Sequence, residues 1–170
     1  MRLELKPHPT TPHSPVQRIE VEVARNGGEL TLAFDVSGDV DAVKTPPLEG
    51  PGRQDGLWRQ TCFEAFIKGQ GDSYFEFNLS PSHRWAGYGF TGYREGQTMP
   101  GLEQPEIALG WEKGRLWMEA RVFLPPESVG KLGLSAVIED VDGRISYWAL
   151  AHPSDKPDFH HPDSFVLDLP

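Results

Sequence analysis

The chain has 170 residues, a formal net charge of −9 and a single cysteine. A globular chain of this length fits one domain and buries about 70% of its unfolded surface, so folding requires neither disulfides nor a structural metal. The acidic balance and the absence of a Lys/Arg stripe from the sequence argue against a nucleic-acid partner, because phosphates demand clustered basic side chains.

The cellular compartment can be predicted from the apolar segments and the single cysteine. No stretch of sequence approaches the roughly 20 apolar residues of a membrane span, and the first residues lack the apolar run of a signal peptide. Cys62 lies in an apolar segment and is expected to be a buried, inert thiol. We therefore expect a cytoplasmic protein with no membrane partner. The sequence leaves the oligomeric state open.

Along the chain, residues 1–15 form a proline-rich arm that is expected to be flexible, together with its His8 and His13. After this arm, apolar and polar residues alternate with period two, which is typical of strands rather than helices. Glycine-containing turn signals separate several of these segments. The predicted strands are residues 19–23, 30–36, 62–67, 74–79, 84–93, 106–111, 116–123, 132–141, 145–150 and 165–169.

About ten short strands without an amphipathic helix predict two packed antiparallel sheets, because a single flat sheet would leave an apolar face in water. We therefore predict an all-β fold, a jelly-roll or immunoglobulin-like β-sandwich, as a single domain over residues 1–170. Segments 37–60 and 152–164 do not fit this scheme. Both are long and carry apolar or ring residues, so they either cap sheet edges or contribute to function.

The hairpin at 62–79 is the strongest functional signal. Glu64, Glu76 and Asn78 fall on the parity opposite to the apolar positions, so they share one face. A symmetric link between the strands would place Glu64 opposite Glu76. Like charges in that position cost stability unless an arginine, a cation or a polar ligand compensates them.

Further residues extend this polar and aromatic face. Arg121 offers a planar donor fork that suits carboxylates and vicinal hydroxyls, while Trp85 and Trp148 offer stacking surfaces. Rings beside fixed donors and acceptors are what a sugar needs. The alternative is an ordinary outer sheet face decorated with Glu and Arg pairs. The predicted ligand-binding residues are Glu64, Glu76, Asn78, Trp85, Arg121 and Trp148.

Two other functions stay open. His152, His160 and His161 lie near several aspartates and form an alternative metal or haem site, although their spacing matches no strict metal signature.

Glu64 and Glu76 also resemble the carboxylate pair of a glycoside hydrolase, but nothing in the sequence shows the raised pKa that such an acid needs. No nucleophile motif is present. The favoured expectation is a protein that is not an enzyme and has no cofactor and no metal.

Finally, the chain resembles the DOMON-like superfamily, which includes type 9 carbohydrate-binding modules, in residues 57–67 (LWRQTCFEAFI), 74–81 (YFEFNLSP) and 85–88 (WAGY). The resemblance is strongest to an uncharacterised bacterial branch of this superfamily. The likeness continues through residues 146–150 and 156–160. It implies a jelly-roll that binds sugar or haem noncatalytically, with Glu64, Glu76 and Asn78 at matching strand positions. Haem-binding members use a methionine with a histidine or lysine, for which Met99 is the candidate here. The expected ligand is a carbohydrate or small polyol.

Overall fold

A computed structural model describes residues 1–11 and 13–170. Within these residues the chain is all-β: it has twelve strands, three 3-10 helices of three residues each, and no α-helix. The strands are β1 Arg2–Pro7, β2 Val16–Asn26, β3 Glu29–Gly38, β4 Gly52–Arg53, β5 Cys62–Lys68, β6 Tyr74–Leu79, β7 Arg84–Phe90, β8 Glu106–Glu112, β9 Arg115–Phe123, β10 Lys131–Glu139, β11 Ile145–Ala149 and β12 Leu167–Asp168. The 3-10 helices are η1 Val40–Ala42, η2 Leu57–Arg59 and η3 Pro162–Ser164.

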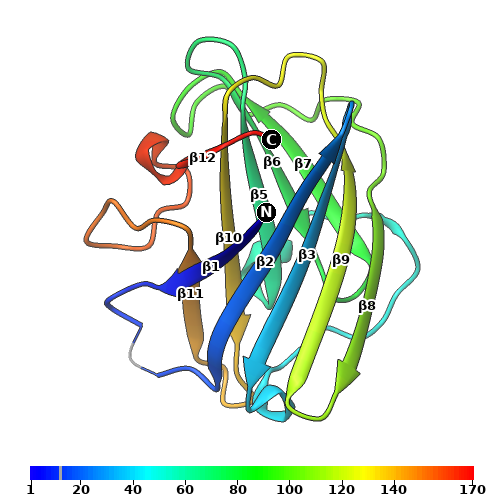
Figure 1. The fold of residues 1–170 in the computed structure, drawn as a ribbon, viewed down its shortest axis with the longest axis vertical. Coiled ribbons are helices and arrows are strands. Elements are labelled where there is room, and N and C mark those ends of the chain that lie inside the picture. The colour runs from blue at the N-terminus through cyan, green and yellow to red at the C-terminus, as the bar shows by residue number, and fades with distance from the viewer. Residues whose placement is uncertain (12) are drawn as a thin grey trace.

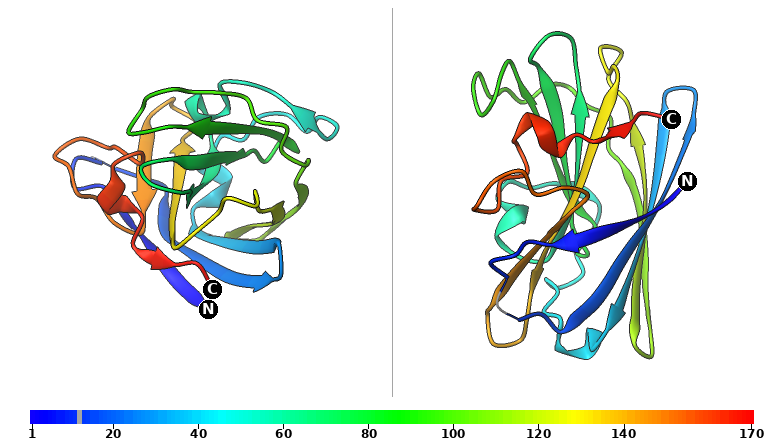
Figure 2. Two further views of the ribbon diagram at one scale, coloured as in Figure 1. Left: turned by 90° about the horizontal axis from the view of Figure 1, so that it is seen from above. Right: turned by 60° about the vertical axis from the view of Figure 1, so that its left-hand side comes forward.

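The strands form one strongly curled sheet with the order β4-β7-β6-β5-β10-β11-β1-β2-β3-β9-β8, and β12 pairs with β10 (Figures 1 and 2). The all-β expectation is confirmed, but two separate antiparallel sheets are not what forms. β1 joins the two halves, because residues 2–5 pair with β2 while residues 6 and 7 pair with β11. The sheet is also mixed, since β4 runs parallel to β7.

The curl brings two strand layers face to face over the main core. The rings of Phe34 on β3 and Phe63 on β5 lie 4.7 Å apart between centroids, so side chains of the two layers meet directly. Alternate residues of β2, β3 and β9 fill this interior, as the period-two pattern of the sequence predicts. Burying these apolar side chains is the main source of stability.

The outer faces of the two layers differ. β9 alternates buried and exposed positions, so its outer face meets solvent. β5 is buried at both parities from Cys62 to Ile67, which means that something covers its outer face as well. The cover comes from Leu57 of η2 and Phe159, which belong to the two segments that do not fit the strand pattern, and from Phe165, which follows the second segment. These segments position the candidate site.

The amino-terminal arm differs from the expectation of flexibility. Arg2–Pro7 forms β1, and His8 after it is buried, with its backbone N–H donating to the Tyr147 carbonyl at 2.8 Å. Its Nε2 lies 3.0 Å from the Ser154 carbonyl oxygen. Residue 12 of the expected arm lies outside the described residues.

In the part of the chain that the structure describes, no helix combines the length and the apolar character needed to cross a bilayer.

Candidate functional site

The candidate site lies on the outer face of β5, β6, β7 and β10. A second hydrophobic cluster, distinct from the main core, packs against this face. Phe66 and Tyr74 come from the sheet, and Phe165 stacks on Phe66 at 5.8 Å between ring centroids. Phe90 stacks on Tyr74 at 4.6 Å. These rings form one wall beside a hollow, which we call the acidic hollow because two glutamates lie in it.

The acidic hollow has a volume of about 660 Å³, within the range typical of small-molecule sites. Its rim contains exposed side chains such as Trp58, Gln97 and Lys156, which give it access to solvent. The lining residues are Trp58, Glu64, Phe66, Glu76, Tyr88, Phe90, Arg94, Gln97, Val137, Tyr147, Lys156, Pro157, Phe159 and His160.

The two glutamates share one face of the β5–β6 hairpin, as the sequence predicts, but in a different register. Glu64 lies opposite Asn78, and Glu76 lies opposite Phe66, so the two acids are diagonal neighbours. The five-residue link 69–73 shifts the predicted pairing by two positions, and a shift of two leaves every side chain on its face. Glu64 is 3% exposed and Glu76 is 4% exposed.

Each carboxylate is held by one short hydrogen bond. The Ser135 hydroxyl donates to Glu64 Oε2 at 2.9 Å, and Asn78 Nδ2 donates to Glu76 Oε1 at 2.7 Å. Burial raises the pKa of both carboxyls well above the ordinary carboxyl range, and repulsion from Glu76 raises the pKa of Glu64 further. The pair therefore holds protons at a pH where a surface glutamate has lost them.

Cys62 lies two residues before Glu64 on the same face of β5 and is buried, as predicted. Its thiol lies 3.7 Å from Asn78 Oδ1. Burial and the nearby Glu64 raise the pKa of this thiol, which keeps it protonated and unreactive.

His160 reaches the same hollow from the 152–164 segment. Its Nδ1 lies 2.7 Å from the Tyr74 hydroxyl, and its Nε2 lies 3.7 Å from Glu76 Oε2. The backbone N–H of Arg94 donates to the Tyr74 oxygen at 3.2 Å, which leaves the hydroxyl hydrogen free to donate to Nδ1. This arrangement assigns the ring hydrogen to Nε2, facing Glu76. Burial, followed by the Arg94 cation, lowers the pKa of His160 to about 4, so the ring is neutral.

Arg94 and Asp158 close one side of the rim. Arg94 adopts a left-handed backbone conformation with φ 55°, which is unusual for a residue other than glycine. Its guanidinium donates to Asp158 Oδ1 at 2.8 Å, and the Tyr93 hydroxyl donates to Oδ2 at 2.5 Å. Burial acts to raise the pKa of Asp158, but these hydrogen bonds outweigh it and hold the pKa below its ordinary value.

Aromatic rings form the remaining walls. Tyr88 on β7 lies opposite Glu76, its hydroxyl donates to Asp55 at 2.8 Å, and the Arg53 guanidinium lies 5.2 Å from its ring centroid. Tyr147 on β11 and Phe159 meet edge to face at 6.1 Å. The acidic hollow therefore has a polar floor and apolar, ring-bearing sides.

The predicted site residues separate into two groups. Glu64, Glu76 and Asn78 come together at the floor of the acidic hollow. Trp85 and Trp148 do not join them, because both point inward and belong to the main core. The Trp148 indole N–H donates to the Ser146 hydroxyl at 3.0 Å. Arg121 lies on the outer face of β9, where it pairs with Glu106, and it does not neutralise the two acids.

The alternative metal or haem residues are also apart. Met99 is 68% exposed, and His152 Nε2 lies 2.7 Å from the Lys6 carbonyl oxygen. His161 accepts a hydrogen bond from the backbone N–H of Asp163 at the start of η3. Among the described residues, no group of three or more His, Cys, Asp or Glu side chains is arranged to hold a metal ion.

The sequence interpretation missed Tyr88, Tyr147, Trp58 and Phe159 as wall residues. The signal for Tyr88 was its place in the 84–93 strand, where it shares parity with Phe90. Tyr147 could be found only through the pairing of β10 with β11, which sets it opposite Val137. Trp58 and Phe159 belong to the two irregular segments, whose position against the sheet no local pattern reveals.

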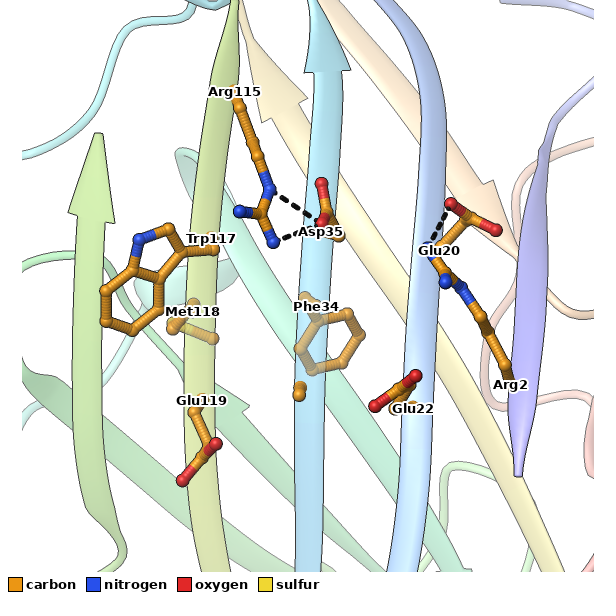
Figure 3. Close-up of a pocket in the computed structure, with 10 residues that line it drawn as sticks. Arg2, Glu20, Glu22, Phe34, Asp35, Arg115, Trp117, Met118 and Glu119 are labelled. Carbon is orange, nitrogen blue, oxygen red and sulfur yellow. Dashed lines mark hydrogen bonds and ion pairs between the residues drawn. The ribbon is translucent and has the colours of Figure 1, made fainter. Parts of the chain in front are cut away.

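A second concavity, shown in Figure 3, lies on the outer face of β2, β3 and β9 and has a volume of about 330 Å³. Its charges are largely paired with each other: Arg2 with Glu20 at 2.8 Å, and Arg115 with Asp35 at 2.5 Å. Such exposed pairs are a normal way to solvate an outer sheet face. It is therefore the weaker candidate for a ligand site.

Comparison with known proteins yields fold relatives only. No protein-family model matches the sequence, and no curated protein matches it. Among solved structures, a candidate carbohydrate-binding protein from Bacteroides uniformis ATCC 8492 matches with a TM-score of 0.67 and 18% identity, over 97% of this chain and 84% of the other.

Two further matches are structures of a family 9 carbohydrate-binding module from Caldicellulosiruptor kristjanssonii. The complex with cellotriose has a TM-score of 0.53 and 10% identity, over 98% of this chain and 80% of that one. The complex with glucose has a TM-score of 0.52 and 11% identity, over 98% and 82%. The resemblance to type 9 modules that the sequence indicates is thus confirmed at the level of the fold.

Proposed function

We propose that the acidic hollow binds a carbohydrate or small polyol and catalyses no reaction on it. One observation carries this proposal: two carboxylates, each more than nine-tenths buried, form the floor of a solvent-accessible hollow whose walls are aromatic. Buried charge is costly without partners, so this floor is suited to a ligand that supplies hydrogen-bond donors.

The chemistry of a sugar matches both surfaces. Its hydroxyls donate to carboxylate oxygens of Glu64 and Glu76, while its apolar C–H face packs on rings such as Tyr88 and Phe159. Trp58, half exposed on the rim, is placed to cover a ligand from outside. A neutral sugar binds through hydrogen bonds and ring packing and forms no ion pair, so its affinity is expected to depend little on salt concentration.

The fold relatives support the ligand class. Two of them are structures of a carbohydrate-binding module with glucose or cellotriose bound. The noncatalytic assignment draws on the same relatives, whose names describe carbohydrate-binding proteins and modules.

Calorimetry against a panel of neutral monosaccharides and oligosaccharides tests the proposal. Glu64→Ala is expected to abolish the binding heat. Glu119→Ala, an exposed glutamate on the outer face of the other layer, serves as the matched control and should leave the heat unchanged. Absence of heat with every sugar, or equal heat in both variants, contradicts the proposal.

A further inference from the structure

We infer that the preferred ligand of the acidic hollow is an amino sugar, a carbohydrate that carries a protonated amino group. This inference rests on the proposed function and narrows it to one chemical class. It follows from the charges around Glu64 and Glu76, which leave the pair without a full counter-charge.

Each acid has one oxygen committed and one free. Glu64 Oε2 and Glu76 Oε1 accept the short bonds from Ser135 and Asn78. Glu64 Oε1 has no hydrogen-bond partner among the described residues, and Glu76 Oε2 is 3.7 Å from His160 Nε2, too far for a good hydrogen bond. The glutamates thus bring two unsatisfied acceptor oxygens into a site that is open to solvent.

None of the neighbouring basic groups neutralises the pair. The Arg94 charge lowers the pKa of Glu76, but burial outweighs it and the guanidinium is paired with Asp158 at 2.8 Å. His160 is neutral because burial and Arg94 oppose its protonation. Lys156 is exposed on the rim. The remaining titratable side chains that line the acidic hollow or belong to the second hydrophobic cluster beside it are Cys62, Tyr74, Tyr88 and Tyr147.

These remaining groups supply no positive charge in any protonation state. Burial raises the pKa of Tyr74 and of Tyr88 to about 12, and it raises the pKa of the Cys62 thiol, so all three are neutral. Ionisation of the glutamates therefore leaves uncompensated negative charge on the floor of the acidic hollow. A ligand that carries a positive charge removes this deficit.

A protonated amine fits the site in shape as well as charge. An ammonium group has three donors and no acceptor, which matches two free carboxylate oxygens. The rings of Tyr88 and Phe90 line the same hollow, and Tyr88 already has one cation, the Arg53 guanidinium, 5.2 Å from its ring centroid, as aromatic rings attract cations. The sugar ring that carries the amine keeps the apolar contacts already described.

Proton linkage gives the inference a distinctive signature. An ammonium ion binds best to the ionised acids, so at low pH its binding displaces protons from the glutamate pair. Affinity is expected to rise with pH as the glutamates ionise and to fall again where the ligand amine loses its own proton. A neutral sugar has no ammonium and shows no such maximum.

The test is calorimetry with matched pairs: glucosamine against N-acetylglucosamine and glucose, and the same sets for galactose and mannose. In at least one set, the amine is expected to bind about tenfold tighter or more than both neutral partners near neutral pH. Repetition in two buffers of different ionisation heat should show proton release at low pH. Glu64→Gln should remove the advantage of the amine, with thermal unfolding used to verify that the variant is folded.

The outcomes separate the two proposals. If neutral sugars bind and no amine binds tighter, the amino-sugar inference is overturned while the proposed function stands. If the advantage persists in folded Glu64→Gln, the charge does not act through this pair and the inference is again overturned. If no sugar of any kind binds, both fail.

Discussion

Glu64 and Glu76 are diagonal neighbours on the adjacent strands β5 and β6. Each accepts one short hydrogen bond, Glu64 from the Ser135 hydroxyl and Glu76 from the Asn78 side-chain amide. The two carboxyls are buried in the same hollow and repel one another when both are ionised. Ionisation of both acids therefore destabilises the free protein, and a ligand that donates hydrogen bonds to their free oxygens offsets this cost.

The stability of the protein should fall as pH rises above the ordinary range of a glutamate. The native carboxyls have raised pKa values, so in this window the native state binds more protons than the unfolded state. The contribution is fully favourable at lower pH and is lost as pH rises through the raised values. Urea unfolding at a series of pH values measures this slope.

Glu64→Gln should stabilise the protein by about 1–3 kcal/mol at neutral pH, because it removes the ionisation of a buried acid and keeps an oxygen for Ser135. The variant should also flatten the pH dependence described above. Glu119→Gln, at an exposed position on β9, should change the free energy of unfolding by less than about 0.5 kcal/mol. Equal effects of the two substitutions would be inconsistent with a strained acid pair.

His160 should remain neutral through the whole range in which surface histidines titrate. Burial and the Arg94 cation lower its pKa to about 4. As pH falls below the ordinary pKa of histidine, the unfolded state gains a proton at this residue before the native state does, so the contribution of His160 to stability decreases. This trend is opposite in direction to that of the glutamates, which favour the native state at lower pH. A nitrogen-15 NMR titration should show an unchanged ring with hydrogen on Nε2, and Tyr74→Phe should disturb it.

Trp58→Ala should lower sugar affinity by about tenfold with little effect on stability, because the ring is half exposed and lies on the rim of the acidic hollow. Trp111→Ala provides a matched control: this indole is 45% exposed but lies on β8, at the far end of the sheet path. Loss of affinity in the control, or its retention in Trp58→Ala, would count against the proposed location.

Gly133→Ala should destabilise the cover of the site. A Cβ at this position on β10 would lie 2.7 Å from Cδ1 of Phe165, which stacks on Phe66. Displacing that ring costs about 1–3 kcal/mol. Gly101→Ala, where a Cβ meets open space, should leave the thermal unfolding temperature nearly unchanged.

Strand alternation was the part of the fold that the sequence predicted well. It put Glu64, Glu76 and Asn78 on one face, and the register error of two residues did not matter because a shift of two preserves the face. Alternation did not place Trp148 correctly, because it does not show which of the two sets of alternate side chains faces the core. Trp148 is in the core, while its neighbour Tyr147 faces the acidic hollow.

The residues that form the walls of the acidic hollow could not be predicted from local sequence patterns. Trp58 and Phe159 are about 100 residues apart, and they meet the same sheet face only because the chain folds back over it. Trp85 shows the opposite case. Its strand carries glycines at 87 and 89, and Leu102 and Pro100 fill the space above them, which turns that face into core.

A crystal of the protein soaked with the sugar that binds best in calorimetry would show where the ligand lies. We expect density for one sugar ring in the acidic hollow, with polar atoms at Glu64 and Glu76 and a ring face against Tyr88 or Phe159. Sugar bound instead on the outer face of β2, β3 and β9, with the acidic hollow free of ligand, would show that the acidic hollow is not the binding site.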